Sequence, residues 1–140
     1  SSADAAVAAK WEDHTQQVLV QTAQLRLATL ATVRGERGYL LTHDESFLAP
    51  YATGRAQMGQ TMELLDRSMA DNPVQQARLD ELRRRVDEHL ATMEQIVALE
   101  RSGEHDAALQ RIRRGEGRAW IESIMAQVNA FEAAEQELLA

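Results

Sequence analysis

The four histidines carry the side chains that a helical protein would most readily use to bind a metal. A di-metal centre in a helical bundle needs a Glu or a second His three or four residues away on the same helix face. None of the four has such a neighbour: His14, His43, His89 and His105. The spacing therefore favours isolated histidines, and we expect no metal and no other cofactor.

The sequence also lacks the motifs that activate a side chain for nucleophilic catalysis. The chain has no Cys, no Gly-x-Ser-x-Gly elbow and no phosphate-binding loop, and Lys10 is its only lysine. We therefore expect this chain not to be an enzyme.

One set of residues is a candidate for binding rather than catalysis. Counting about ten residues along each expected helix from the distal turns brings a set of small residues to the same level along the helix axes. These residues are Ala31, Thr32, Gly54, Thr92, Gly115 and Gly117. Four arginines lie near the same level: Arg34, Arg55, Arg114 and Arg118. Guanidinium groups recognise carboxylates and phosphates, so a small anionic ligand would bind here. The alternative is that the small residues only allow the helices to pack closely, with the arginines in solvent. Small residues have this packing role more often than they form a pocket.

Composition predicts an all-α protein that forms a single domain over residues 1–140. Helix-forming residues are frequent, only two prolines occur, and no segment has the pattern of a strand. The 15 basic and 22 acidic residues give a net charge of −7, which disfavours nucleic acid and anionic membrane surfaces as partners.

Apolar residues recur at helical spacing over residues 3–41, 45–69, 73–101 and from about 105 to the end. Thr42 and Glu45 form a capping box that predicts the second helix start. Asn72 predicts the next N-cap, with Pro73 at the first helical position and Gln75 completing a second box. Gly103 predicts the left-handed residue that ends the third helix.

Four helices joined by short turns predict an antiparallel up-down-up-down bundle. The first and last helices are the longest, so we expect them to continue past the bundle as a two-helix stalk near a membrane, with Trp11 and Phe131 in its packing. No run reaches the ~18 apolar residues of a membrane span. Neither end of the chain carries a helix stop signal, which suggests that both helices continue into flanking transmembrane helices.

Three segments carry a family resemblance. The first is Glu36-Arg37-Gly38-Tyr39-Leu40-Leu41-Thr42 with Asp44-Glu45-Ser46-Phe47-Leu48 and Pro50-Tyr51; the others are Asp71-Asn72-Pro73-Val74-Gln75 and Arg114-Gly115-Glu116-Gly117. Together they resemble the third class of CHASE domains, the extracellular sensory modules of bacterial receptors, over nearly the whole chain. His43 departs from the Gly common in such hairpins, although His is enriched in the left-handed region.

The resemblance implies an extracytoplasmic, periplasmic domain between two membrane spans, with a histidine kinase, cyclase or chemotaxis-type output. The hairpin signature is structural: Glu36, Arg37, Gly38, Tyr39, Thr42, Asp44, Phe47 and Tyr51. We expect a homodimeric sensory domain that responds to a small-molecule or protein stimulus by shifting its first helix against its last. The alternative is a soluble helical interaction or oligomerisation module, which would lack flanking apolar segments.

Overall fold

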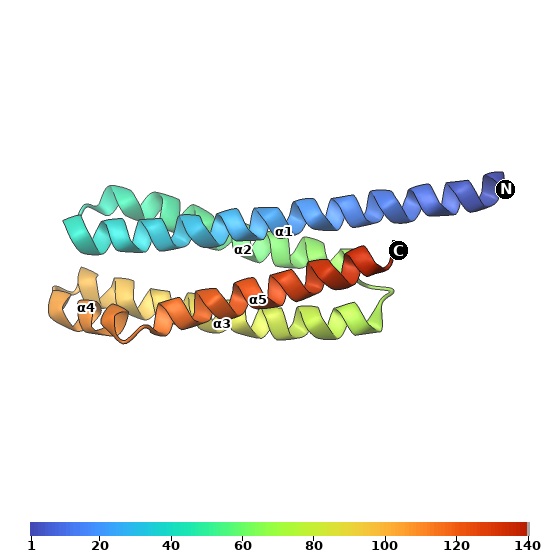
Figure 1. The fold of residues 1–140 in the computed structure, drawn as a ribbon. Coiled ribbons are helices and arrows are strands. Elements are labelled where there is room, and N and C mark those ends of the chain that lie inside the picture. Colours follow the sequence, from blue (N-terminus) through green and yellow to red (C-terminus); the bar gives the residue numbers. More distant parts are fainter. Residues whose placement is uncertain (140) are drawn as a thin grey trace.

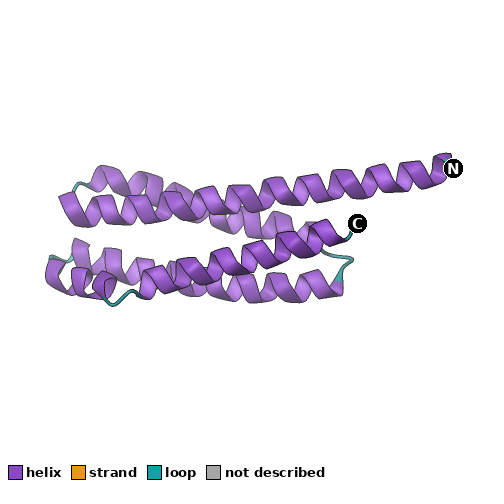
Figure 2. Cartoon of the chain, viewed as in Figure 1, coloured by secondary structure: helices purple, strands orange, loops and turns teal. Residues whose placement is uncertain are grey.

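The computed structural model describes residues 1–139, and helices account for nearly all of them (Figure 2). Helix α1 (Ser2–Thr42) is followed by a short 3-10 helix, η1 (Glu45–Phe47), and by α2 (Leu48–Ser68). Helices α3 (Pro73–Arg101), α4 (His105–Arg113) and α5 (Glu116–Glu137) complete the chain. No strand occurs within the described residues. The all-α prediction is confirmed.

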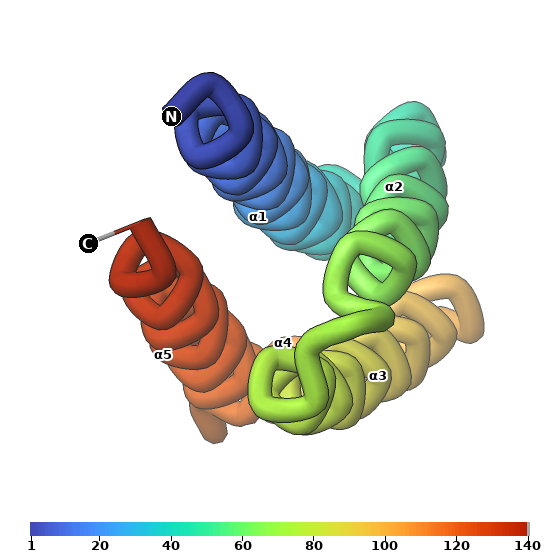
Figure 3. The backbone as a smooth tube through the Cα atoms, turned by 90° about the vertical axis from the view of Figure 1, so that its right-hand side faces the viewer, coloured from blue at the N-terminus to red at the C-terminus, as the bar shows by residue number. Residues whose placement is uncertain are grey.

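The helices form two antiparallel pairs that lie side by side, α1 with α2 and α3 with α5 (Figure 1). Viewed from the end, these four helices occupy the four corners of a bundle, with α1 beside α5 (Figure 3). The short α4 follows α3 at the distal end and precedes α5. The helices alternate in direction, as the up-down-up-down prediction requires.

Apolar residues at helical spacing fill the interior in two adjoining clusters. The larger one takes Leu25 from α1, Leu65 from α2, Leu82 from α3 and Phe131 from α5, all at most 1% exposed. The distal cluster is built around Tyr39, which is fully buried. Burying each such side chain stabilises the fold by roughly 1.5–3 kcal/mol, so the bundle depends on both clusters.

The turn between α1 and α2 differs from the predicted capping box. Helix α1 continues through Thr42, whose hydroxyl donates to Gly38 O at 2.7 Å and accepts from the Asp44 N–H at 3.0 Å. The carboxylate of Asp44, not Thr42, caps η1 by accepting from Ser46 N–H at 2.9 Å. The capping-box prediction for Thr42 is therefore wrong, because Thr42 still lies in the preceding helix. His43 adopts the left-handed conformation expected of it, with φ 53°.

Glycines on α1 let α2 approach its backbone directly. A Cβ on Gly35 would lie 2.8 Å from Phe47 O and 2.9 Å from Tyr51 N, and a Cβ on Gly38 would enter the Phe47 ring. Gly54 allows the same close approach from α2, because its Cβ would lie 2.8 Å from Thr32 Cγ2. The contact with Phe47 explains Gly38 of the hairpin signature by packing.

A buried carboxylate fastens the distal ends of the two helix pairs together. Glu100, near the end of α3, is 2% exposed. Its carboxylate oxygens lie 2.6 Å from Nδ1 of His105 and 3.6 Å from Nδ1 of His43. The His43 ring also stacks on Tyr39, with 5.2 Å between ring centroids. The end of α1 is therefore joined to the turn between α3 and α4.

The turn between α2 and α3 confirms two predicted roles and corrects a third. Asn72 caps α3 by accepting from Gln75 N–H at 3.1 Å, and Pro73 is the first helical residue. The Gln75 side chain does not complete a capping box. Its amide instead donates across the bundle to Phe131 O at 3.2 Å and to the Glu135 carboxylate at 3.1 Å. Gln75 is buried against α5, so its side-chain amide pairs with groups of α5 and not with the N-terminus of α3.

The expected fourth helix is interrupted. Gly103 ends α3 in the left-handed conformation, as predicted, with φ 85°. A second left-handed glycine, Gly115 at φ 78°, then separates α4 from α5. The prediction of one continuous helix from residue 105 onward is wrong, because Gly115 takes a conformation that no α-helix allows.

Within residues 1–139, only α1 projects past the turn between α2 and α3, while α5 ends near the level of that turn (Figure 1). Trp11 is 50% exposed and lies on α1 beside the turn between α2 and α3, whereas Phe131 is 1% exposed in the core. The expectation that Phe131 packs in a stalk with Trp11 is therefore wrong. The break at Gly115 accounts for the difference, since it interrupts the long helix from which the stalk was predicted.

We expect Gly35→Ala to destabilise the protein and Gly59→Ala to stabilise it. The first methyl would overlap the backbone of α2, a type of overpacking that costs roughly 1–3 kcal/mol. Gly59 lies within α2 with open space around it, so alanine there should add up to about 1 kcal/mol of helix propensity. Urea unfolding followed by circular dichroism measures both changes; equal effects would contradict the close-contact interpretation.

Candidate functional site

A cavity of about 200 Å³ opens between α1, α3 and the junction of α4 with α5. Helix α1 supplies Val33, Glu36 and Arg37 to its wall, and α3 supplies His89 and Ile96. The junction supplies the rest: Ile112, Arg113, Gly115, Gly117, Arg118 and Ile121. The interruption at Gly115 therefore forms one side of the cavity.

Glu36 is the acidic group of the cavity. It is 7% exposed, and its Oε2 has no hydrogen-bond partner in residues 1–139. Burial raises the pKa of the Glu36 carboxyl to about 7, against a weaker opposing effect of the Arg37 charge. A carboxyl group in this state changes its charge near neutral pH, so it can donate or accept a hydrogen bond there.

His89 faces the same cavity from α3. It is 1% exposed, and neither ring nitrogen has a hydrogen-bond partner within the described part of the chain. Burial, together with a smaller effect of the Arg55 charge, lowers the pKa of the His89 imidazole to about 4. His89 is therefore neutral at pH 7, with one nitrogen able to donate and the other able to accept.

Arginines lie around the more exposed side of the cavity. Arg37, Arg113 and Arg118 all line it. Of the four arginines predicted to bind an anion, Arg118 is the one that reaches this cavity, where it also pairs with Glu122 at 3.2 Å. Arg37 was assigned to the turn, and Arg113 was not singled out from the sequence.

The other three predicted arginines lie elsewhere. Arg55 joins α2 to α3, donating to Leu90 O at 2.8 Å and to Tyr51 Oη at 3.1 Å. Arg34 and Arg114 are exposed and do not line the cavity. Sequence counting placed the arginines at a common height, but it did not determine which of them face the space between α1 and α3.

Three of the four histidines lie beside glutamates that are far away in the sequence or just outside helical spacing. His14 Nε2 lies 3.2 Å from Glu135, and His43 and His105 lie beside Glu100. Across residues 1–139, no group of three or more His, Asp or Glu side chains is arranged to hold a metal ion.

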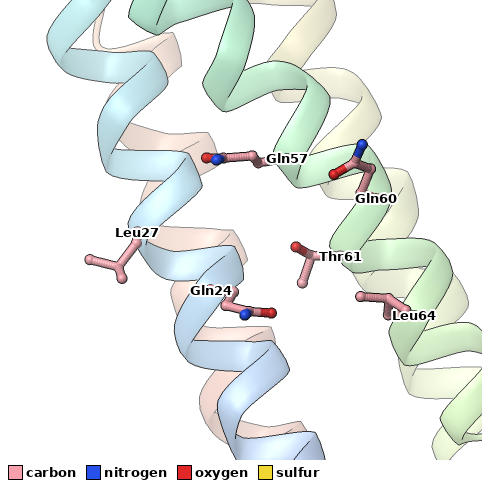
Figure 4. Close-up of a pocket in the computed structure, with 6 residues that line it drawn as sticks. All are labelled: Gln24, Leu27, Gln57, Gln60, Thr61 and Leu64. Carbon is pink, nitrogen blue, oxygen red and sulfur yellow. The ribbon is translucent and has the colours of Figure 1, made fainter.

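A second surface feature lies between α1 and α2, on the outside of that helix pair (Figure 4). This groove, of about 360 Å³, is lined by Gln24, Leu27, Gln57, Gln60, Thr61 and Leu64. Leu27 is 68% exposed and Leu64 is 41% exposed. The groove contains no charged residue, so it differs in character from the cavity that holds Glu36 and His89.

A polar cluster joins α1 to α5 below the cavity. Arg26 donates to the Glu132 carboxylate, with one contact at 2.8 Å, and to Asn129 Oδ1 at 2.5 Å. Thr22 donates to the same carboxylate at 2.6 Å. The hydrogen bonds from Arg26 hold the pKa of the Glu132 carboxyl below its usual range. We refer to Thr22, Arg26, Asn129 and Glu132 as the α1–α5 cluster.

The comparisons with known proteins agree with this architecture. The family model described as the CHASE3 domain matches residues 8–140. The chain belongs to the CHASE3 domain family. This confirms the resemblance drawn from the hairpin and the two later turns.

Two solved structures share the fold of this CHASE3 domain. The sensor domain of histidine kinase HK9 from Rhodopseudomonas palustris is 29% identical, with a TM-score of 0.82 over 89% of this chain and 97% of that one. A chain of the XylFII-LytSN complex is 12% identical, with a TM-score of 0.77 over 88% and 98%. The comparison with curated protein sequences gives no match.

Family and fold together identify this CHASE3 domain as the sensory input domain of a signalling receptor. Input domains of this kind are non-catalytic, consistent with the expectation from the sequence. Among residues 1–139, every helix falls short of the length of apolar sequence that a bilayer crossing requires.

We expect Glu36→Gln to stabilise the CHASE3 domain at pH 8 but to have little effect at pH 4. The pKa of Glu36 is about 7 in the folded state and near 4.5 when exposed, so its stabilising contribution is complete below about pH 4.5 and is lost as the pH rises through 7. The full loss is about 3 kcal/mol, which the glutamine variant avoids.

Urea unfolding of both proteins at pH 4, 6 and 8 measures this difference. Comparing the two proteins at the same pH cancels the contribution of His89 to the free energy of unfolding. That contribution increases with pH, whereas the contribution of Glu36 decreases. Glu63→Gln, at an exposed position on α2, is the matched control. Equal stability of Glu36→Gln and the parent at pH 8 would show that the Glu36 carboxylate is not destabilised by burial.

Proposed function

We propose that this chain is the periplasmic, ligand-sensing domain of a bacterial transmembrane receptor with a histidine kinase output. The observation that carries the proposal is the cavity in which Glu36 and His89 are buried without partners, located between α1 and the α4–α5 junction. Unpaired polar groups inside a protein cost stability, and a bound molecule that pairs them recovers it. The sensor domain of histidine kinase HK9 supports the choice of output.

The transmitted motion is a displacement of α1, together with α2, against α5. Helices α1 and α2 pack backbone to backbone through Gly35 and Gly54, so they move as one unit. Helices α1 and α5 are joined instead by the α1–α5 cluster, whose polar contacts have alternative partners in water. A ligand that binds one packing better than the other shifts the population between them. The two helices then carry that shift toward the membrane.

We also propose that the domain is a homodimer that pairs through the groove between α1 and α2. Leu27 is exposed on α1, and Leu64 is exposed across the groove on α2 (Figure 4). Uncharged glutamines surround them. Apolar side chains grouped with no charge between them mark an interaction surface. The same surface supports the alternative of an interaction module, which differs by having no membrane spans.

We expect Arg26→Ala and Glu132→Gln to change the basal autophosphorylation of the full receptor by about fivefold or more, because each variant weakens the link between α1 and α5. Receptor in native membranes and labelled ATP provide the measurement. Arg84→Ala removes a surface ion pair within α3 and is the matched control. Unchanged output in both α1–α5 variants would contradict signalling by displacement of these helices.

We expect Leu27→Glu to weaken self-association by about tenfold or more, since two copies would bring the new charges into an apolar contact. Sedimentation velocity over a concentration series measures the association. Leu41→Glu, at an apolar position that is 82% exposed and outside the groove, should leave it unchanged. A parent protein that is monomeric at all concentrations would exclude this dimer.

A further inference from the structure

We infer that the cavity between α1, α3 and the α4–α5 junction binds a small organic acid that carries a hydroxyl group at the end remote from its carboxylate. The inference deepens the proposed sensory function and rests on it. It follows from three features of the cavity: the partners missing at its buried end, the apolar side chains of its wall, and the charge at its exposed side.

The buried end calls for a group that both donates and accepts hydrogen bonds. Glu36 and His89 are 7% and 1% exposed, and Glu36 Oε2 and both His89 ring nitrogens lack partners among residues 1–139. A hydroxyl offers one donor and two acceptor sites, so it can pair with both residues in either protonation state of Glu36. A purely apolar ligand would leave these groups unpaired.

The middle of the cavity suits a hydrocarbon chain or ring. Val33 and Ile96 are buried, and Ile112 and Ile121 are half-buried beside them. Apolar walls with a few polar groups that fix orientation are the usual composition of a small-molecule site. A volume of about 200 Å³ has room for roughly seven to ten non-hydrogen atoms, given about 30 Å³ for one liquid water molecule.

The exposed side favours a carboxylate. Three guanidinium groups line it, on Arg37, Arg113 and Arg118, and Glu122 neutralises one of them through its contact with Arg118. Arg55 adds positive charge behind His89, where it is partly offset by Glu94 at 3.6 Å. Glu36 is the acidic residue among those lining the cavity. The remaining charge is positive, which disfavours a cationic ligand and favours an anion.

Four probes of nearly equal length separate these requirements: 6-hydroxyhexanoate, hexanoate, 1,6-hexanediol and 6-aminohexanoate. Isothermal titration calorimetry of this chain at pH 7 should give the tightest binding for 6-hydroxyhexanoate. Hexanoate lacks the hydroxyl and hexanediol lacks the carboxylate, so each should bind about tenfold or more weakly. The aminohexanoate replaces the hydroxyl with a cation and should also bind more weakly.

Variants assign the two ends of the ligand. Arg113→Ala should weaken 6-hydroxyhexanoate binding and leave hexanediol binding unchanged. His89→Phe should remove the advantage of 6-hydroxyhexanoate over hexanoate. Arg67→Ala, at an exposed position on α2 away from the cavity, is the matched control and should change neither. Circular dichroism establishes that each variant is folded before titration.

Other outcomes overturn the inference. Equal binding of hexanediol and 6-hydroxyhexanoate would show that the arginines do not select an acid, and tighter binding of aminohexanoate would assign Glu36 to a cation. Binding of none of the four to the folded parent would exclude this ligand class. The output of the Arg26 and Glu132 variants is measured without ligand, so a failure here is distinguishable from failure of the proposed signalling function.

Discussion

The direct backbone contact between α1 and α2 is the constraint on which the rest of the arrangement depends. Gly35, Gly38 and Gly54 remove the side chains that would otherwise hold the two helices apart. The gain is a tightly fitted pair whose internal motion is restricted by steric overlap. The displacement proposed above therefore falls at the boundary between that pair and the helices α3, α4 and α5.

That boundary contains the larger apolar cluster, to which all four long helices contribute, and polar contacts lie beside it. The polar contacts are the α1–α5 cluster and the side chains of Glu36 and His89, whose Oε2 and ring nitrogens have no hydrogen-bond partner among residues 1–139. Hydrogen bonds of this kind contribute little net stability because water competes for them, whereas leaving them unmade in the interior is costly. The polar contacts are therefore the part of this boundary that a bound molecule or water can most readily rearrange.

Features set by neighbouring residues were predictable from the sequence. Asn72 and Pro73 start α3, Gly103 ends it, and His43 takes the left-handed conformation. The helix break at Gly115 was missed because a single glycine also occurs inside helices; the second glycine two residues later was the available signal. Local patterns therefore predicted both ends of α3 and the overall topology, but neither the start of α2 nor the break at Gly115.

The candidate site depended on information that local patterns do not hold. Glu36 and Arg37 were recognised as residues of the hairpin, but only the packing of α1 against α3 places them in a shared cavity with His89. Counting along helices placed the predicted arginines at one level, yet each residue turns the side chain by about 100°, so Arg113 lines the cavity and Arg114 does not. The position of a residue along the bundle axis follows from counting residues. The direction of its side chain depends on how its helix is rotated about its own axis.

The buried Glu100 carboxylate between His43 and His105 makes the distal end a fulcrum. It ties the two halves of the bundle together at the end from which α1 and α5 both run. Two rods joined at one end separate in proportion to distance from the joint. The N-terminal part of α1 lies far from this joint (Figure 1). The displacement proposed above, if it starts at the cavity lined by Glu36 and Arg37, is therefore larger where α1 leaves the bundle than at the cavity itself.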